Sequence, residues 1–313
     1  MRQTLVTGGA GFIGSHIVGA LLEQGASVRV LDNFSSGRRD NLSAVVRPHT
    51  ASRLHVIEAD VRDQVAVAQA VRGVDTIFHE AAFVSAAESV IKPLECFAVN
   101  VGGTAILLEE ARKAGVQRVV IASSAAVYGD SDALPLSEEM PHSPLSPYAA
   151  SKSADEVYAA MYTRAYNLQV VALRYFNVYG PRQRPDSMYA AAVPIFLSRR
   201  LERQPVTIYG DGLQTRDLIY IDDVVRANLL AADHESAPGQ TFNICTGRET
   251  SIRDLLQCID QLMPGSQPAQ FAKARPGDVY KSLGNPAKAL VILGFSARTS
   301  LAEGLKVTLE WMR

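Results

Sequence analysis

The sequence has few cysteines, no long apolar run and almost no net charge, and each absence excludes a class of protein. Its three cysteines, Cys96, Cys245 and Cys258, lack the spacing of a metal site or a disulfide framework, so we expect reduced packing residues and no metal. No run of about 20 apolar residues occurs, which predicts that no helix spans a membrane. The net charge of −1 predicts no bulk attraction to nucleic acid or to an anionic membrane.

The remaining composition is typical of a cytosolic enzyme. With 313 residues and 47% hydrophobic content, the chain is long enough to bury a large core, and we expect one larger and one smaller lobe. Glycines interrupt the apolar N-terminal stretch, and nothing there resembles a signal cleavage site. We therefore predict a cytoplasmic location.

The N-terminal segment has the pattern of a dinucleotide-binding loop. The apolar run 4–7 leads into the glycine-rich segment 8–14 (GGAGFIG), and a helical pattern follows. This order places backbone N–H groups and the positive end of a helix dipole against a pyrophosphate. The next apolar strand pattern ends in Asp32, about 20 residues downstream, where a carboxylate would accept hydrogen bonds from ribose hydroxyls. Asp32 would repel a 2′-phosphate, which favours NAD over NADP, although Arg38 and Arg39 lie near enough in sequence to accommodate one.

Tyr148 and Lys152 stand four residues apart in the segment SPYAASK, which places both on one helix face with Cβ atoms roughly 5–6 Å apart. A phenol titrates near 10, so titration at about 7 requires about 4 kcal/mol of preference for the phenolate. One cation about 4 Å away, at an effective dielectric of about 20, supplies roughly that much. The pair therefore predicts a phenol that acts as a base.

Strand-like and helical patterns alternate through the first half of the chain. This alternation predicts an α/β fold with a Rossmann-like, doubly wound parallel sheet, because right-handed crossovers place helices on both faces. We expect a smaller, interleaved C-terminal substrate-binding lobe: 1–174 is the predicted NAD-binding domain, to which 216–246 returns, and 175–215 with 247–313 form the lobe. The predicted strands are 4–7, 27–31, 54–58, 76–79, 118–122 and 169–174, and the predicted helices include 64–71, 93–114 and 151–166.

Further motifs follow in order: Asp60-Val61, HEAA at 79–82, NVGGT at 100–104 and Ser123-Ser124 before Tyr148, then RYFN at 174–177, YGDG at 209–212 and RPGD at 275–278. With the glycine loop, they span nearly the whole chain. In this order the chain resembles the extended short-chain dehydrogenase/reductase family. More narrowly, it resembles the NAD-dependent nucleotide-sugar epimerases and dehydratases, and is closest to the UDP-glucose and UDP-N-acetylglucosamine 4-epimerases.

The resemblance implies NAD as cofactor and Ser124, Tyr148 and Lys152 as catalytic residues, with Ser124 hydrogen-bonded to the sugar 4-hydroxyl. The alternative for Ser124 is a strand-end serine that satisfies local backbone. Some epimerases of the family have a lysine where this chain has Val84, so one cofactor contact of that subgroup is missing. The implied cofactor-binding residues are Gly8, Gly11, Phe12, Ile13, Gly14, Asp32, Asn33, Asp60, Val61, Ala81, Ala82, Asn100, Tyr148, Lys152 and Tyr175.

On the substrate side, the resemblance implies arginine and asparagine contacts to a diphosphate, an aromatic ring that stacks a base, and a carboxylate that binds the nucleotide ribose. Forked guanidinium donors suit a diphosphate. Two alternatives remain open: Tyr209 packed in the core, and Arg216 paired with Asp217. The implied substrate-binding residues are Ser124, Asn177, Val193, Tyr209, Arg216, Arg275, Asp278 and Ser282.

The residues after Ser124 favour epimerisation over elimination. Dehydratases of the family resemble one another in a TDEVYG segment, since elimination of water needs an added acid and base, and decarboxylases commonly keep its glutamate. This chain has Ala125 and Ala126 there. The resemblance implies C4 epimerisation of a UDP-hexose or UDP-N-acetylhexosamine through a 4-keto intermediate. Ser282 stands where epimerases restricted to unsubstituted hexoses carry a tyrosine, which leaves room for a 2-acetamido group.

Several other functions stay open. A UDP-glucuronate 4-epimerase, a dTDP- or UDP-sugar 4,6-dehydratase and a decarboxylase belong to the same family, and a non-catalytic NAD-sensing regulator belongs to another class. The resemblance also implies a homodimer in which helices 93–114 and 151–166 form a four-helix bundle across a twofold axis. Candidate interface residues are Leu107, Leu108, Tyr158, Met161 and Tyr162, for which core packing is the alternative.

Overall fold

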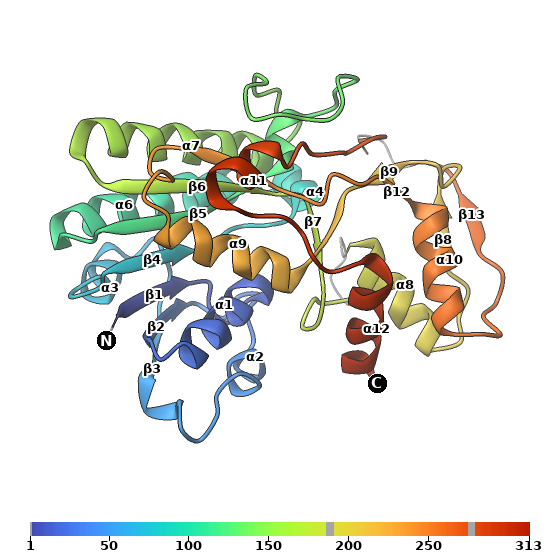
Figure 1. Ribbon diagram of the computed structural model, residues 1–313, viewed down its shortest axis with the longest axis horizontal. Coiled ribbons are helices and arrows are strands. Elements are labelled where there is room, and N and C mark those ends of the chain that lie inside the picture. The colour runs from blue at the N-terminus through green and yellow to red at the C-terminus, as the bar shows by residue number, and fades with distance from the viewer. Residues whose placement is uncertain (1, 186–190, 275–278) are drawn as a thin grey trace.

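A computed structural model describes residues 2–185, 191–274 and 279–313. Its centre is a seven-stranded sheet in the order β11-β6-β5-β4-β1-β2-β3, and every pair of neighbouring strands is parallel (Figure 1). The predicted doubly wound sheet is confirmed. The strands of this sheet are β1 (Gln3–Thr7), β2 (Ser27–Asp32), β3 (Leu54–Glu58), β4 (Thr76–His79), β5 (Arg118–Ser124), β6 (Gln169–Tyr175) and β11 (Thr241–Ile244).

Helices cover both faces of the sheet. Neighbouring side chains of each strand point to opposite faces, and apolar side chains on both faces need to be buried. Leu5 joins the apolar cluster beneath α3 (Gln64–Ala70), α6 (Gly103–Ala114) and α7 (Pro147–Tyr166). Val6 joins the cluster beneath α1 (Phe12–Glu23) and α9 (Ile221–Asp233). Strands buried on both sides account for the nearly continuous apolar runs in the sequence.

The predicted helical stretch 93–114 is confirmed in its bounds, but it is not one regular α-helix. It consists of α5 (Pro93–Phe97), a π-helical turn (Ala98–Gly102) and α6, joined without a break in the chain. A Cβ on Gly103 would lie 2.6 Å from a methyl carbon of Val61, so α6 can approach this valine only with glycine at its first position. The wide turn brings the buried Asn100 toward the loop after β4, as π turns often do at functional sites.

Three of the five residues predicted for a dimer interface belong to the core instead. Leu107, Leu108 and Tyr162 are buried in the cluster between the sheet and helices α3, α6 and α7. Only Tyr158 and Met161 are exposed. The reason is that both faces of α6 and α7 carry apolar residues, so sequence periodicity alone does not show which face meets the sheet.

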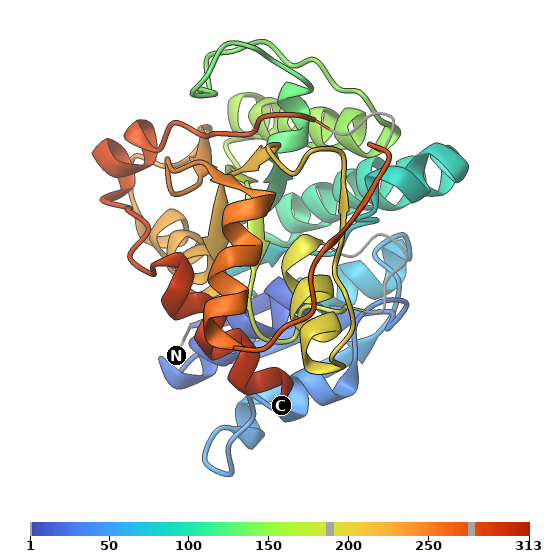
Figure 2. The same cartoon turned by 90° about the vertical axis from the view of Figure 1, so that its right-hand side faces the viewer.

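The C-terminal elements form a smaller group beside the carboxyl edge of the sheet, at the right of Figure 1 and facing the viewer in Figure 2. Val193, Ile208 and Leu255 from this group share one apolar cluster with Val6 and Leu173 of the sheet. A common core therefore holds the group against the sheet. Its main elements are α8 (Ala192–Leu201), β8 (Thr207–Tyr209), α10 (Ile252–Leu262), β13 (Gln270–Ala272) and α12 (Leu301–Met312).

The remaining elements are short. They are α2 (Arg39–Ser43), α4 (Ala86–Ile91), α11 (Ala287–Leu293), β7 (Asn177–Tyr179), β9 (Thr215–Arg216), β10 (Leu218–Tyr220), β12 (Thr250–Ser251) and the 3₁₀ turns Ala51–Arg53 and Ala125–Tyr128. None of the helices in the described ranges is both long enough and apolar enough to cross a membrane.

Candidate active site

The glycine-rich loop lies where β1 ends and α1 begins. Gly8 has φ 66°, and a Cβ there would lie 2.6 Å from the backbone nitrogen of Ala81, so the loop packs directly against the chain that follows β4. A Cβ on Gly14 would lie 2.2 Å from the carbonyl oxygen of Gly8. Gly11 caps α1 without a side chain, which leaves the first-turn N–H groups to an external acceptor. The loop therefore fits a pyrophosphate.

Asp32 ends β2 beside this loop. Its carboxylate accepts hydrogen bonds from the N–H groups of Ala10 (2.9 Å) and Phe34 (2.8 Å), one on each oxygen. Burial raises the pKa of Asp32, although these two donors oppose the shift. Each carboxylate oxygen keeps a further lone pair for a ribose hydroxyl. Arg39 is paired with Glu58 and lies over the Phe34 ring, with 4.2 Å from its guanidinium carbon to the ring centroid, which supports NAD over NADP.

Asn33 and Asp60 lie together beyond Asp32. Asn33 donates to Asp60 (2.8 Å), and Arg62 donates to both Asp60 oxygens at 2.8 Å. These Arg62 hydrogen bonds hold the pKa of Asp60 well below its usual range. Val61 is buried against Gly103. The structure thus places Asp60 and Val61 at the carboxyl edge of the sheet, where the family resemblance expects adenine.

Asn100 connects the π-helical turn to two neighbouring segments. Its Oδ1 accepts from the N–H of Phe83 (2.7 Å), and its Nδ2 donates to the Phe83 carbonyl (3.1 Å) and to Ser151 Oγ (2.8 Å). These hydrogen bonds fix the chain after Ala81 and Ala82 relative to α7. The structure therefore gives Asn100 a role in shaping the cofactor site through the backbone.

The Tyr148 and Lys152 pair lies in the first turns of α7. Ser146 caps this helix by accepting from the N–H of Ala149 (3.1 Å), and Pro147 occupies the first helical position. Lys152 is 3% exposed, and its ammonium lies 3.3 Å from Asp155. Burial is the largest influence on the pKa of Lys152 and lowers it, but the charges of Asp155 and Tyr148 outweigh burial and raise it. The structure thus places the Lys152 ammonium near Tyr148, the predicted catalytic phenol.

Ser124 ends β5 opposite Tyr175 of β6. Its Oγ accepts from the N–H of Ala126 (3.1 Å), which is the local backbone role considered as the alternative. An accepting hydroxyl still has its own proton to donate, so the two roles are compatible. Ala125 and Ala126 form the following 3₁₀ turn and offer neither an acid nor a base.

Two residues of the HEAA segment have roles that sequence reasoning missed. His79 is buried between the hydroxyls of Thr7 (Nδ1, 2.7 Å) and Thr104 (Nε2, 2.9 Å), and burial with nearby Lys152 lowers the pKa of His79 to about 3. Glu80 accepts from the Tyr175 hydroxyl (2.8 Å), and burial raises its pKa to about 7. A buried carboxyl beside two predicted cofactor contacts is a recognisable signal of a functional site.

Asp217 connects the segments that carry the predicted substrate residues. Its carboxylate accepts from the N–H groups of Thr246 (2.8 Å), Gly247 (2.9 Å) and Gly284 (3.4 Å), and its carbonyl accepts from the N–H of Asn177 (3.0 Å). Asp217 therefore anchors these segments through their backbone.

The substrate residues differ in exposure. Tyr209 ends β8 with 36% of its surface exposed, so the alternative that it packs in the core is wrong. Val193 lies inside the core at 1% exposure, whereas Asn177, Arg216 and Ser282 are half-buried. The predicted contacts Arg275 and Asp278 lie outside the described residues.

A doubly wound sheet, a glycine loop with an acidic residue on the next strand, and a helical tyrosine-lysine pair define a Rossmann-fold enzyme of the dehydrogenase type, built for a nicotinamide dinucleotide. The model of the NAD dependent epimerase/dehydratase family matches residues 4–245, and the chain belongs to this family. Its cofactor is NAD.

Relatives resemble the chain over nearly its full length. It is 42% identical over 313 residues to the UDP-glucose 4-epimerase of Mycolicibacterium smegmatis, with 99% of this chain and 98% of that protein covered. It is similar to the UDP-N-acetylglucosamine 4-epimerase from Methanobrevibacter ruminantium, solved in complex with UDP-N-acetylmuramic acid, with TM-score 0.94, 36% identity and coverage of 99% and 98%. It is also similar to the Thermus thermophilus UDP-glucose 4-epimerase in complex with NAD, with TM-score 0.89, 39% identity and coverage of 100% and 99%.

Proposed function

We propose that the protein is an NAD-dependent isomerase that inverts C4 of a UDP-hexose or UDP-N-acetylhexosamine. One observation carries this proposal: Lys152 lies between Tyr148 and Glu80, whose segment packs against Gly8 of the NAD loop, while alanines occupy the positions after Ser124 where elimination would need an acid and a base. The full-length similarity to UDP-sugar 4-epimerases supports it.

Each catalytic residue has a defined task in this reaction. NAD, when bound, supplies a reversible hydride acceptor for C4. Tyr148 takes the proton of the C4 hydroxyl and later returns it, and the Lys152 ammonium stabilises the phenolate between these steps. Ser124 donates a hydrogen bond to the C4 oxygen. Inversion requires that the 4-keto sugar turns over while the nucleotide stays bound.

The substrate residues support anchoring at the nucleotide. Tyr209 is 36% exposed at the end of β8, where this proposal has it stack the base, and Asp217 joins the backbone of Asn177 to the strand segment that carries Arg216, the two proposed diphosphate contacts. The half-buried Ser282 leaves room for a 2-acetamido group. In this proposal, 175–215 and 247–313 form the nucleotide-sugar lobe, 216–246 returns to the NAD domain 1–174, and the enzyme is cytoplasmic.

The test is NMR of purified protein with NAD and, separately, UDP-glucose, UDP-N-acetylglucosamine and UDP-glucuronate. We expect the 4-epimer of the first two, with C6 unchanged. A 4-keto-6-deoxy product would identify a dehydratase, and loss of carbon dioxide would identify a decarboxylase. Epimerisation of UDP-glucuronate alone would identify a uronate epimerase. Bound NAD without turnover of any of the three sugars would support the alternative of a non-catalytic NAD-sensing regulator.

We further propose a homodimer through α4, α5 and α7, which pack against one another. Ile91, Leu94 and Phe97 are 70%, 82% and 60% exposed on α4 and α5, and Tyr158 and Met161 are exposed on α7, which packs against both helices. Exposed apolar side chains on helices that pack together are typical of an interface.

The dimer is tested by sedimentation or light scattering of Leu94→Glu. We expect the variant to be a monomer, because a charge at the centre of an apolar interface is costly to bury. Val65→Glu is the matched control, since Val65 is 68% exposed on α3, outside this surface. A dimeric Leu94→Glu variant, or a monomeric wild type, would contradict the proposal.

A further inference from the structure

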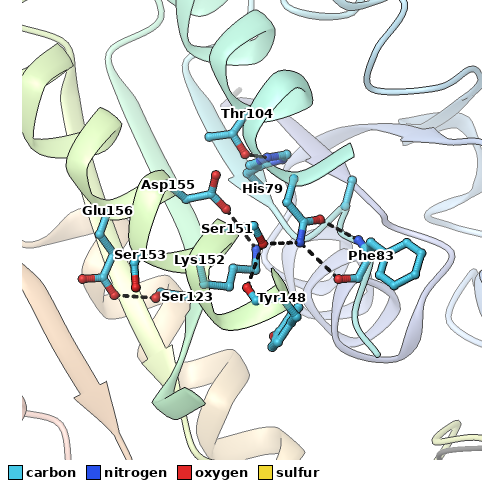
Figure 3. Close-up of polar contacts among 12 residues, drawn as sticks. His79, Phe83, Thr104, Ser123, Tyr148, Ser151, Lys152, Ser153, Asp155 and Glu156 are labelled. Carbon is cyan, nitrogen blue, oxygen red and sulfur yellow. Dashed lines mark hydrogen bonds and ion pairs between the residues drawn. The ribbon is translucent and has the colours of Figure 1, made fainter. Parts of the chain in front are cut away.

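Asp155 shares one helix face with the catalytic pair. Positions 148, 152 and 155 are spaced by four and three residues, so their side chains lie along one side of α7. Figure 3 shows the Lys152 side chain between the Asp155 carboxylate and Tyr148. The Asp155 side chain is 2% exposed, and its Oδ2 lies 3.3 Å from the Lys152 ammonium.

A contribution to stability does not explain why an aspartate occupies position 155. Its other oxygen, Oδ1, is buried and has no hydrogen-bond partner among the described residues. A buried carboxylate with one ion pair and one unsatisfied oxygen generally costs free energy relative to an apolar residue. Alanine would also suit the helix better. The reason for an aspartate is therefore its effect on Lys152.

A polar line behind Asp155 connects it to the NAD loop. The Thr104 hydroxyl lies close enough to lower the pKa of Asp155, although burial dominates and raises that pKa to about 6. Thr104 also contacts Nε2 of His79, and Nδ1 of His79 contacts Thr7 at the end of β1. Because His79 stays neutral, a proton on Nε2 lets Thr7 donate to His79 and His79 donate to Thr104, so the line ends at a hydroxyl near Asp155 that forms no hydrogen bond with its Oδ1.

Asp155 is the acidic group in direct contact with the Lys152 ammonium, at 3.3 Å. Glu80 also faces the ammonium from the loop after β4, but its pKa of about 7 makes it partly neutral there. Burial raises the pKa of the Cys96 thiol on α5, so Cys96 is neutral, and His79 is neutral as well. Among the described residues, Asp155 is the one acidic group that forms an ion pair with the Lys152 ammonium.

We propose that Asp155 is a positioning residue of the epimerase reaction, which holds the buried Lys152 side chain in place and keeps its ammonium charged beside Tyr148. This role rests on the proposed function. It differs from a structural role because it acts on the protonation of Lys152, and therefore on the pH dependence of turnover.

The test compares pH profiles of kcat and KM for UDP-glucose, measured on the NAD-loaded wild type, Asp155→Asn, Asp155→Ala and Asp223→Asn. Without the carboxylate, burial lowers the pKa of Lys152, so we expect the basic limb of the kcat profile to move down by about one pH unit or more. At high pH this corresponds to a loss of about tenfold in kcat, with KM nearly unchanged. Asp155→Ala introduces no new polar side-chain atom at position 155 and serves if Asp155→Asn folds poorly.

Asp223 is the matched control, because it is an equally buried aspartate whose carboxylate accepts from the N–H groups of Arg298 and Thr299. Asp223→Asn is expected to lower stability and leave the pH profile in place. The proposal would be overturned if the kcat profiles of Asp155→Asn and Asp155→Ala superimpose on that of the wild type, or if kcat falls by the same factor at every pH. An inactive wild type would instead refute the proposed function.

Discussion

Replacement of Glu156 by glutamine is expected to destabilise the protein strongly. The Glu156 and Arg174 side chains are 5% and 3% exposed, and Arg174 donates to both carboxylate oxygens, at 2.9 and 2.7 Å. Ser123 donates to the same carboxylate, which links the strand end beside Ser124 to α7. Glutamine keeps the shape but leaves the Arg174 charge buried without a counter-ion, which typically costs about 3–5 kcal/mol.

The pKa of Glu156 leads to a similar value for the loss of unfolding free energy. Burial is the largest influence and raises it, but hydrogen bonds from Arg174 and His142 outweigh burial and lower the pKa to about 2, from 4.5. A decrease of about 2.5 pH units corresponds to about 3 kcal/mol. For 313 residues, an unfolding entropy of about 2.1 cal/mol/K per residue converts this to a fall in Tm of about 5 °C.

The pH dependence has a definite sign. Because the folded pKa is depressed, the contribution of Glu156 is complete above about pH 5 and is lost as the pH falls toward 2. The difference in unfolding free energy between wild type and Glu156→Gln should therefore shrink from about 3 kcal/mol at pH 7 to about 1 kcal/mol at pH 3.

The assay is urea unfolding followed by circular dichroism at several pH values. Glu58→Gln is the matched control, since Glu58 pairs with Arg39 on the surface, where both side chains are more than half exposed. Surface pairs contribute little, so this variant should resemble the wild type at every pH. A Glu156→Gln variant within about 1 kcal/mol of the wild type at pH 7, or a difference that does not shrink in acid, would refute the reasoning.

Two further predictions address the cofactor and the chemistry. Tyr148→Phe removes only the hydroxyl, so kcat for UDP-glucose, followed by NMR, should fall by about 10²–10⁴-fold with unchanged NAD content, and near-normal turnover would mean that another group is the base. Gly8→Ala should lose bound NAD, measured by absorbance after denaturation, because its Cβ would meet the backbone of Ala81 at 2.6 Å. Gly73 has nearly the same φ, 67°, but a Cβ there would have nothing within 4 Å, so Gly73→Ala should keep NAD. Equal loss of NAD in both variants would show that backbone strain, and not the close approach to Ala81, is responsible.

Much of the fold and of the candidate site followed from short-range patterns. Alternating strand and helix patterns predicted the parallel sheet, and the four-residue spacing of Tyr148 and Lys152 predicted their shared helix face. These predictions hold because periodicity and spacing act within a few residues. They do not show how two elements far apart in sequence face each other.

Contacts between elements were decided only by the tertiary structure. Leu107 and Leu94 are both apolar helix residues, yet one is buried and the other is 82% exposed, because sheet packing selects the face of each helix. The π-helical turn likewise depends on the fit of Gly103 against Val61 and of Asn100 against Phe83.

Sequence patterns alone predicted the chemical groups of the candidate active site: the glycine loop, Asp32, Ser124 and the helical tyrosine-lysine pair. The surroundings of these groups, such as His79 between Thr7 and Thr104 from three separate elements, became visible only in the folded structure. The physical reason is that spacing within one helix or turn is encoded locally. Burial, charge and hydrogen bonding between elements depend on how the whole sheet and its helices pack.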